Sequence, residues 1–497
     1  AAHDVPCAAA AAAEVAAACR LPSSSVYAPT RLVEEAGERR AVDAAEAAPR
    51  EVAEGAWRSD DVHYGHPKAE VRQLLRGPVS VEDPRLRLAV RVFVEQVLRR
   101  PLYDAALGGL GYGISVASKG MVVATSGFTE HLPRLTRDVM SRLRSFCAEG
   151  KLDEQELELQ RSRMLEQLRS WNTSQPDSLA FDVLDHLLEE PSRLPPQLLA
   201  DVAAATPEEL LDALSRAAAA PDGVLTYAHG GVSAEEVAGL HRDAAAHAGA
   251  GAGGDAQKAK VRVMPRGEAV RVTARHPNPT DKNSGYVGLW QVGKYEMHQH
   301  AVLMVLARLI REPAFTALRT KRSLGYVVSS GVHRSGDGRG VEGLYISVSS
   351  KTFSPEAVEA EVLNFLGEFE STLEGVDDGQ VQRLAEAVAK ELTVAPNSPY
   401  TEGRRWWGEV YHATHEFDYM DKLAAALRGV AADDIRAMAR DVLFDEANRR
   451  YAAVLIRGAG EKGEGAHLEA AAAAGVEATD MEEGLEALRT RLGKFWE

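Results

Sequence analysis

Apolar positions recur at helical spacing through much of the chain, in segments that follow a similar order in its two halves. The periodicity predicts an amphipathic helix over 88–98, where Asp83 and Pro84 supply an N-cap and a first-turn proline. A second apolar helix is expected over 301–310. In the second half a further helix begins at Ser354, and its apolar stripe consists of Val358, Val362, Phe365, Leu366 and Phe369.

Strand patterns lie between these helices. Leu344, Ile346 and Val348 alternate with polar positions, which predicts a strand over 344–350 that packs on one face. Helices interleaved with neighbouring antiparallel strands predict the α+β class, as two α/β sandwich domains whose helices pack on one face of a mostly antiparallel sheet. The other predicted elements are a β-rich stretch over 121–125, helices over 153–168 and 377–392, and strands over 224–230 and 454–458 that end in glycine.

A short motif indicates that the two halves are copies of one domain. Residues 99–112 contain Arg-Arg-Pro-Leu-Tyr and then Leu-Gly-Tyr, and residues 311–326 contain Arg-Glu-Pro-Ala-Phe and then the same Leu-Gly-Tyr. Such internal similarity is typical of a duplicated unit. We therefore predict a low-complexity lead-in over 1–21, a first domain over 22–247, a Gly/Ala linker over 248–257, a second domain over 258–459 and a tail over 460–497 with a short helix around 485–492.

Composition narrows the classes of function. The chain of 497 residues carries 57 Lys and Arg against 73 Asp and Glu, a formal net charge of −16. This balance disfavours a nucleic-acid-binding protein, because phosphate contacts depend on basic residues. Three cysteines are too few for a disulfide framework, so we expect a reducing compartment such as the cytoplasm. No apolar run reaches the length of about 18 residues that a membrane span needs.

Zinc ligands are the first candidate chemistry, since the chain has 15 histidines. The inverted motif His-x-x-Glu-His, which places two ligands on one helical face beside a water-activating Glu, is absent. His412 and His415 stand three residues apart with Glu416 on the wrong side, and His298 and His300 would diverge on a helix. We predict that these histidines are solvated or packing residues and that this chain holds no metal.

No nucleophile or anion-binding motif is complete. Ser115 lacks the second glycine of a nucleophile elbow and is predicted to be a strand residue. Residues 229–231 precede a capping box at Ser233, which favours a structural turn over an anion site. Trp406 and Trp407 are either a binding platform or a core anchor, and their helical setting favours the core anchor.

One segment departs from the acidic average. Residues 305–340 hold seven basic and two acidic side chains, a local charge of +5. Such a cluster is either a positive wall that attracts acidic or carboxylate-rich ligands or a solvated basic turn. The basic residues are Arg308, Arg311, Arg319, Lys321, Arg322, Arg334 and Arg339.

At this segment the chain resembles a known family. Residues 312–328 read Glu-Pro-Ala-Phe-Thr-Ala-Leu-Arg-Thr-Lys-Arg-Ser-Leu-Gly-Tyr-Val-Val. They are similar to the Glu-Pro-x-Phe-x-x-Leu-Arg-Thr-x-x-x-Leu-Gly-Tyr block in the C-terminal half of the insulin-degrading enzyme (insulysin/pitrilysin) family of zinc metallopeptidases. The resemblance covers residues 22–458. It continues at 400–409 and, more loosely, at 29–30, 168–171 and 224–230.

The resemblance implies four homologous α+β domains that form two bowl-shaped halves around a peptide chamber. In that family the zinc motif lies in the first domain, so the resemblance places Zn²⁺ on the N-terminal half. This chain matches the third and fourth domains, and we expect it to bind no cofactor and to be inactive alone. Its expected partners are the catalytic N-terminal half and peptide substrates, but neither nucleic acid nor a membrane. An initial Ala in place of Met points to part of a longer polypeptide, although a separately encoded catalytic half is the other possibility.

The resemblance also implies a substrate site. Arg319 and Tyr326 match the residues that reach the substrate at the scissile bond, and a guanidinium and a phenol can donate hydrogen bonds to a peptide carbonyl and its developing oxyanion. Tyr112 of the first copy lacks the arginine, because Leu107 or a neighbouring glycine stands there, and is expected to be structural. The expected function is the non-zinc-binding half of a metalloendopeptidase. The alternative is an inactive peptide-binding or structural subunit that kept the fold.

Overall fold

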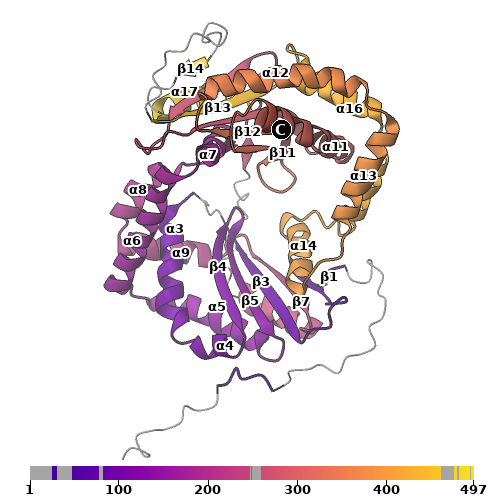
Figure 1. Cartoon of the computed structure of the whole chain (residues 1–497). Helices are drawn as coiled ribbons and strands as arrows, with labels where there is room; N and C mark the ends of the chain where they lie inside the picture. The colour runs from indigo at the N-terminus through magenta and orange to yellow at the C-terminus, as the bar shows by residue number, and fades with distance from the viewer. Residues whose placement is uncertain are drawn as a thin grey trace, which may run out of the picture.

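The computed structural model describes residues 25–30, 48–77, 82–246, 248, 259–459, 475–477, 481–492 and 494–496. These residues form two six-stranded sheets with helices around them (Figure 1). The predicted lead-in over 1–21 and all but one residue of the predicted linker over 248–257 lie outside the described residues. Among the helices that the structure describes, none combines the length and the apolar character needed to cross a lipid bilayer.

The first sheet has the strand order β1-β2-β7-β3-β5-β4. β2 and β7 run parallel, and the other neighbouring pairs are antiparallel. Its strands are β1 (Arg50–Ala53), β2 (Ala56–Ser59), β3 (Lys68–Arg76), β4 (Gly111–Ala117), β5 (Gly120–Phe128) and β7 (Val224–Gly230). Ser115 lies on β4, as predicted.

The second sheet has the strand order β11-β12-β10-β13-β9-β14. Here β9 runs parallel to both of its neighbours, β13 and β14, and the remaining pairs are antiparallel. Its strands are β9 (Ala269–Arg275), β10 (Ser284–Lys294), β11 (Val327–Ser335), β12 (Val341–Ser350), β13 (Tyr451–Arg457) and β14 (Gly475–Glu477). A separate short pair joins β6 (Glu189–Glu190) to β8 (Lys260–Val261).

The helices of the first half begin with α3, whose N-cap Asp83 accepts a hydrogen bond from the backbone N–H of Arg85 and whose first residue is Pro84, as predicted. Residue Ser233 caps α10 in a capping box directly after β7, which confirms the structural turn. The helical segments are α3 (Pro84–Phe93), η1 (Val94–Arg99), α4 (Tyr103–Leu107), α5 (Leu132–Glu149), α6 (Glu154–Ser170), η2 (Trp171–Thr173), α7 (Pro176–Leu188), α8 (Pro195–Ala204), α9 (Pro207–Ala218) and α10 (Ala234–Ala245).

In the second half, α12 begins after the predicted N-cap Ser354. The helical segments are α11 (Met297–Ala314), η3 (Phe315–Lys321), α12 (Pro355–Glu374), α13 (Asp378–Leu392), α14 (Pro399–His412), α15 (Tyr419–Arg428), α16 (Ala432–Ala439), η4 (Arg440–Phe444) and α17 (Met481–Arg491). The helix predicted around 485–492 is α17, and it buries Leu485, Leu488 and Leu492 in the cluster that also contains residues of α7.

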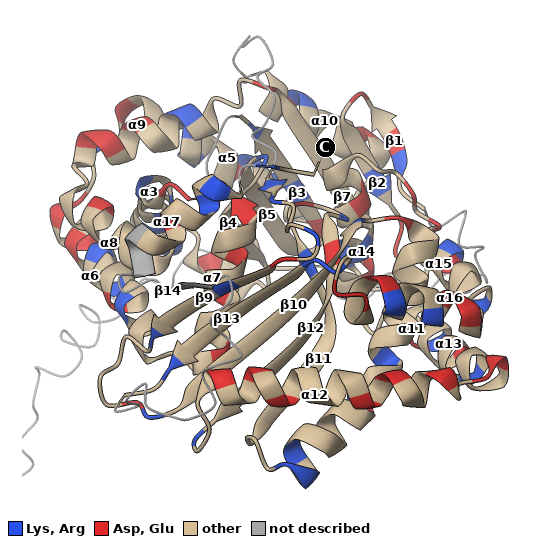
Figure 2. Ribbon diagram, turned by 90° about the horizontal axis from the view of Figure 1, so that it is seen from above, with Lys and Arg blue, Asp and Glu red and all other residues tan. Residues whose placement is uncertain are grey.

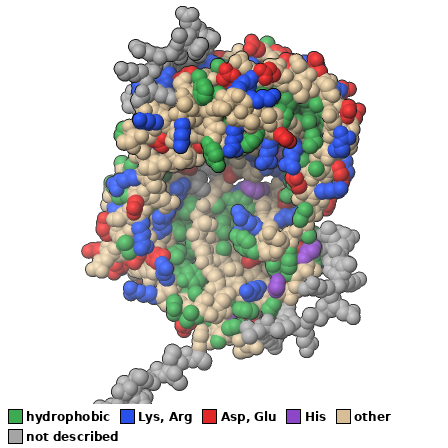
Figure 3. Space-filling model, in the orientation of Figure 1, with side chains coloured by type: hydrophobic (Ala, Val, Ile, Leu, Met, Phe, Trp, Pro, Cys, Tyr) green, Lys and Arg blue, Asp and Glu red, His purple; other side chains and the backbone are tan. Residues whose placement is uncertain are grey.

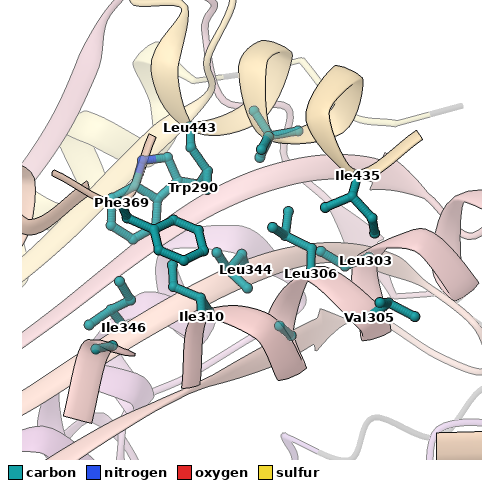
Figure 4. Close-up of a cluster of buried hydrophobic side chains, with 14 of the residues drawn as sticks. Trp290, Leu303, Val305, Leu306, Ile310, Leu344, Ile346, Phe369, Ile435 and Leu443 are labelled. Carbon is teal, nitrogen blue, oxygen red and sulfur yellow. The ribbon is translucent and has the colours of Figure 1, made fainter. Parts of the chain in front are cut away.

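The alternating face of β12 and the stripe of α12 meet in one core, as their patterns predict. Leu344, Ile346 and Val348 are fully buried there together with all five predicted stripe residues of α12. Figure 4 shows Ile310 of α11, Phe369 of α12 and Trp290 of β10 gathered with the β12 side chains. This packing joins α11 firmly to the sheet, and α11 leads directly to the candidate site.

Each sheet packs against a helix of the other half as well as its own. On β10, Tyr286 and Trp290 lie in the core with α11 and α12, whereas Val287 and Leu289 point to the opposite face and contact the cluster formed by α7 of the first half. Helices therefore cover both faces of the sheet, not one face as expected. The physical reason is that β10 is apolar on both faces, so that both need cover.

The reciprocal contact is made by α14 of the second half, which lies on the first sheet (Figure 1). Its residues Trp406 and Trp407 are buried against Leu74 of β3 and Leu225 and Tyr227 of β7. The two tryptophans are thus anchors, as the helical setting favoured, but they anchor one half to the other. We call α7 and α14 the exchanged helices.

Candidate substrate-binding site

Arg319 and Tyr326 lie at opposite ends of a turn that follows α11. The helix starts at Glu296, whose carboxylate accepts hydrogen bonds from the N–H groups of two residues in the first turn, and contains Pro313 near its end. After the proline the chain adopts the π-helical segment η3, a form that is frequent at functional sites. Pro313 has no N–H to give to the helical ladder, which favours this local change.

Two buried leucines fix the turn. Leu318 and Leu324 are at most 1% exposed, and the N–H of Leu324 donates to the carbonyl of Leu318 at 3.0 Å. Between them Ser323 has a φ of +53°, a left-handed conformation that a serine adopts only when its surroundings hold it. The anchored leucines therefore leave Arg319 and Tyr326 on the outside of a rigid turn.

The structure brings Arg319 and Tyr326 together. The guanidinium carbon of Arg319 lies 4.6 Å from the ring centroid of Tyr326 and 4.8 Å from that of Phe315. Contacts of this kind attract the cation to the faces of both rings and fix its direction. Tyr326 is 80% exposed, and among the described residues no carboxylate lies within ion-pair distance of Arg319. The donors of both side chains therefore remain available to a ligand.

The positive charge of the basic segment 305–340 is partly neutralised in the folded structure. Four of its arginines form ion pairs with carboxylates from outside the segment. Two of these carboxylates, Glu361 and Glu368, lie on α12, whose acidic positions Figure 2 shows in red. Arg311, Arg319 and Lys321 have no ion-pair partner among the described residues. The segment is thus neither a continuous positive wall nor a simple solvated turn. The paired residues are Arg308 with Glu391, Arg322 with Glu361 and Glu368, Arg334 with Glu342, and Arg339 with Glu409 and Glu416.

One of these pairs belongs to a buried network. Burial alone would raise the pKa of Glu342, but hydrogen bonding to His300 and the Arg334 guanidinium hold that pKa below its usual range. His300 Nδ1 lies 2.9 Å from a Glu342 carboxylate oxygen, while His298 is largely exposed and lies 3.8 Å from Asp434. The two histidines diverge, as expected, and their roles are local.

A cavity of about 720 Å³ borders the turn on the side of β11. The cavity lies between α11, α13 and the edge strand β11 of the second sheet. Figure 3 shows the molecule hollowed between its two lobes, with hydrophobic and basic side chains gathered in the hollow. The lining residues are Arg308, Arg311, Glu312, Phe315, Val328, Ser329, Ser330, Tyr345 and Leu384.

The first copy has no equivalent pair. Tyr112 is the second residue of β4 and is partly buried, and burial raises the pKa of its phenol. Leu107, at the place where an arginine would be needed, is 69% exposed, and Arg99 pairs with Glu95 at 2.5 Å. This arrangement agrees with a structural role for Tyr112.

The residues that the structure describes contain no group of three or more His, Cys, Asp or Glu side chains arranged to hold a metal ion. His415 instead packs against Trp57 in a tilted arrangement with ring centroids 4.4 Å apart, and His412 packs edge-on against Tyr411. No catalytic step through zinc is assigned to these residues.

A buried polar cluster escaped prediction. Ser59 Oγ lies 2.9 Å from His229 Nδ1, and His229 Nε2 lies 3.5 Å from Glu402 Oε2 on α14. The order hydroxyl, imidazole, carboxylate is that of a hydrolase triad. All three residues are at most 2% exposed, however, so a substrate has no access and the cluster joins the two halves instead.

Sequence reasoning missed this cluster because its members are far apart in the chain. Gly403 was the one available signal: a Cβ atom there would stand 2.4 Å from Glu70 Oε1 and 2.9 Å from His229 Cδ2. A glycine in the interior of a helix is unfavourable without such a reason. The glycine therefore marks a close approach of α14 to the first sheet.

Comparisons with known proteins identify the fold and the order of its units. The family model for the middle or third domain of peptidase M16 matches residues 7–201, and the model for domain 4 in the C-terminal lobe of PqqF-like PQQ synthase matches residues 305–407. The insulin-degrading enzyme of Homo sapiens is 23% identical over 425 residues, which cover 80% of this chain and 39% of that protein. That of Drosophila melanogaster is 24% identical over 412 residues, with 80% and 40% covered.

Solved structures agree. Pitrilysin matches with a TM-score of 0.75 at 18% identity, covering 89% of this chain and 46% of its own. An inactive peptidase M16 domain from Pseudomonas fluorescens matches with a TM-score of 0.59 at 13% identity, covering 84% of this chain and 98% of its own. The α+β fold of two sandwich units is thereby confirmed, and the chain spans well under half the length of the curated relatives it matches. The two matched domains, their order along the chain and the shared fold make this chain similar to the C-terminal half of the insulinase-family proteins, peptidase M16.

Proposed function

We propose that this chain is the non-zinc-binding half of a zinc metalloendopeptidase of the insulinase family, which closes a degradation chamber and positions the peptide for cleavage. The observation that carries the proposal is Arg319, held between two aromatic rings with its donors free, beside the exposed Tyr326. A side chain fixed in advance loses little entropy when it binds a substrate.

The pair suits the carbonyl of a scissile bond. As that carbonyl becomes tetrahedral its oxygen gains negative charge, and N–H and O–H donors already aimed at it stabilise the transition state more than the ground state. Arg319 supplies guanidinium N–H donors and Tyr326 its phenolic O–H. Water activation must come from the catalytic partner half, to which we assign the zinc motif.

Reconstitution tests this function. The chain is mixed with the N-terminal half of a family relative that carries His-x-x-Glu-His, and cleavage of an internally quenched fluorogenic peptide is followed. We expect no cleavage by this chain alone and a rise of at least about tenfold over the N-terminal half alone, because Arg319 and Tyr326 complete the site. No rise in any stable complex of the two halves would overturn the proposal.

A second candidate is an inactive peptide-binding or structural subunit that kept the fold. It is favoured by the match to the inactive domain from Pseudomonas fluorescens, which this chain covers over 98% of its length. In that case a complex with a catalytic half forms, or peptides bind, without any gain in cleavage. The same reconstitution therefore separates the two candidates.

A further inference from the structure

β11 is an edge strand with an unprotected edge. It pairs on one side with β12 through a continuous antiparallel register from Val327 opposite Ser349 to Ser335 opposite Val341. On its other side no described backbone group hydrogen-bonds to it. Such an edge presents a row of N–H and C=O groups that another extended segment can pair with.

Natural sheets usually protect an edge with charge, proline, a bulge or a very short strand. β11 is nine residues long and has no register shift, and its first six residues, Val327–Val332, are Val-Val-Ser-Ser-Gly-Val, without charge or proline. A regular edge whose first six residues carry no charge favours aggregation unless another segment pairs with it.

The cavity beside this edge contains features that select a ligand. Its walls bring Arg308 and Arg311 of α11 opposite Ser329 and Ser330 of β11. Arg311 has no ion-pair partner among the described residues, whereas Arg308 is paired with Glu391 at 2.9 Å. The Ser330 hydroxyl is buried and has no hydrogen-bond partner in the described part of the chain.

We infer that an extended peptide adds as a strand to the free edge of β11 and places an acidic side chain in the cavity, where Arg311 binds it. The inference rests on the proposed function and names its substrate class: peptides with Asp or Glu near the cleaved bond. β11 starts directly after Tyr326, and Ser329 and Ser330 follow three and four residues later. At about 3.3 Å per residue, the acidic side chain stands roughly 10–13 Å along the strand from Tyr326.

Peptide binding to the full chain alone tests the charge preference. A fluorescein-labelled ten-residue peptide with one Glu is compared with the same peptide carrying Gln, by fluorescence anisotropy at low ionic strength. We expect the Gln peptide to bind about tenfold more weakly, as a charge-assisted hydrogen bond is lost. Arg311→Gln should remove the difference between the two peptides. Arg311 is exposed, so this variant should keep the thermal stability of the native chain.

The matched control is Lys321→Gln. Lys321 is likewise exposed and without an ion-pair partner among the described residues, but it does not line the cavity. This variant should retain the full preference for the Glu peptide. Equal affinity of the Glu and Gln peptides for the native chain, or equal losses in the Arg311 and Lys321 variants, would overturn the assignment of Arg311.

Strand addition is tested separately with N-methylated peptides. Alternate residues of an added strand point their N–H groups at β11, so methylation of one alternating set should abolish binding while methylation of the other set is tolerated. Equal binding of both sets would contradict strand addition. These measurements involve no catalytic half, so they stand even if reconstitution fails. Conversely, a reconstituted enzyme that cleaves Glu and Gln peptides equally would refute only the inference.

Discussion

Arg319 shows how one side chain acquires a role from its immediate neighbours. An arginine on a surface turn ordinarily samples many rotamers, and binding it to a ligand costs conformational entropy. Here Phe315 and Tyr326 hold it from two sides, and buried leucines hold the backbone beneath it. The position of the guanidinium is thereby set before any peptide arrives.

The pair can be tested by single substitutions in the reconstituted enzyme. We expect Arg319→Ala and Tyr326→Phe each to lower kcat by about 10- to 1000-fold, since each removes a donor from the developing oxyanion. Steady-state cleavage of the fluorogenic peptide measures the effect. Tyr112→Phe, the same change in the first copy, should leave kcat within twofold, and unchanged kcat in all three variants would remove Arg319 and Tyr326 from the site.

His186 on α7 gives a prediction about pH. Burial and the neighbouring Arg489 guanidinium lower the pKa of His186 to about 4. In the unfolded chain His186 has an ordinary pKa of about 6.5 and binds a proton below that pH. In the folded chain His186 stays neutral until about pH 4, so acid favours the unfolded state. The free energy of unfolding should therefore fall by about 1–3 kcal/mol between pH 7 and pH 4 on account of this residue.

Urea unfolding followed by circular dichroism at several pH values measures this effect. His186→Gln should flatten the pH dependence over that interval, whereas His298→Gln, a change at a largely exposed histidine, should leave the slope unaltered. Parallel slopes for the native chain and the His186 variant would contradict the prediction.

Among the elements, α14 contains two glycines in different settings. A Cβ atom at Gly403 would collide with Glu70 and His229 of the first sheet, whereas a Cβ atom at Gly408 would meet no atom within 4 Å. We expect Gly408→Ala to stabilise the protein by up to about 1 kcal/mol through helix propensity. Gly403→Ala should instead destabilise it by about 1–3 kcal/mol, because the contact with the sheet must open.

Thermal unfolding of the two alanine variants, monitored by calorimetry, decides this prediction. Because both changes lie on one helix and add one methyl group, propensity alone would raise both melting temperatures. A melting temperature of the Gly403 variant at or above that of the native chain would show that α14 does not approach the first sheet as closely as described.

The elements that the sequence predicts well are those whose burial is decided locally. A few neighbouring residues are enough to predict each of these features: the stripe of α12, the alternating face of β12, and the caps Asp83 and Ser354. Trp406 and Trp407 were correctly expected to be anchors, yet their partners Tyr227 and Leu74 lie about 180 and about 330 residues away in the chain. Periodicity indicates that one face of a helix is buried, but it does not indicate which sheet covers that face. The exchange of α7 and α14 could therefore not be predicted from the sequence.

The candidate site follows the same rule. Arg319 and Tyr326 are predicted site residues because they lie in one specific block of sequence, and their contact is a consequence of the short turn between them. The charge of +5 over 305–340 was misleading, because Glu361, Glu391 and Glu409, which neutralise it, come from other elements. Charge counted along a chain ignores the partners that folding supplies.

For the whole molecule, the exchanged helices predict that the two halves depend on each other. A first half without α14 would expose Leu74, Leu225 and Tyr227, and a second half without α7 would expose Val287 and Leu289. Fragments 1–253 and 254–497 produced together should therefore associate and elute as one species in size-exclusion chromatography. Each fragment produced alone should aggregate, because a large apolar patch is uncovered.

The intact chain is the control in that experiment, and it should elute at the same volume as the paired fragments. Two separate, monodisperse monomers would contradict the prediction. Such a result would mean that the contacts of α7 and α14 are weak and that each sheet tolerates one bare face.

The exchange of α7 and α14 also constrains how a peptide would enter the proposed enzyme. Each half places a helix on the sheet of the other, so moving the two halves apart would require pulling Trp406 and Trp407 out of an apolar interface. In the proposed enzyme, a substrate would then be admitted at the rim where this chain meets the catalytic half. The rate of that opening, and the largest peptide admitted, would be set by contacts outside this chain rather than by a hinge within it.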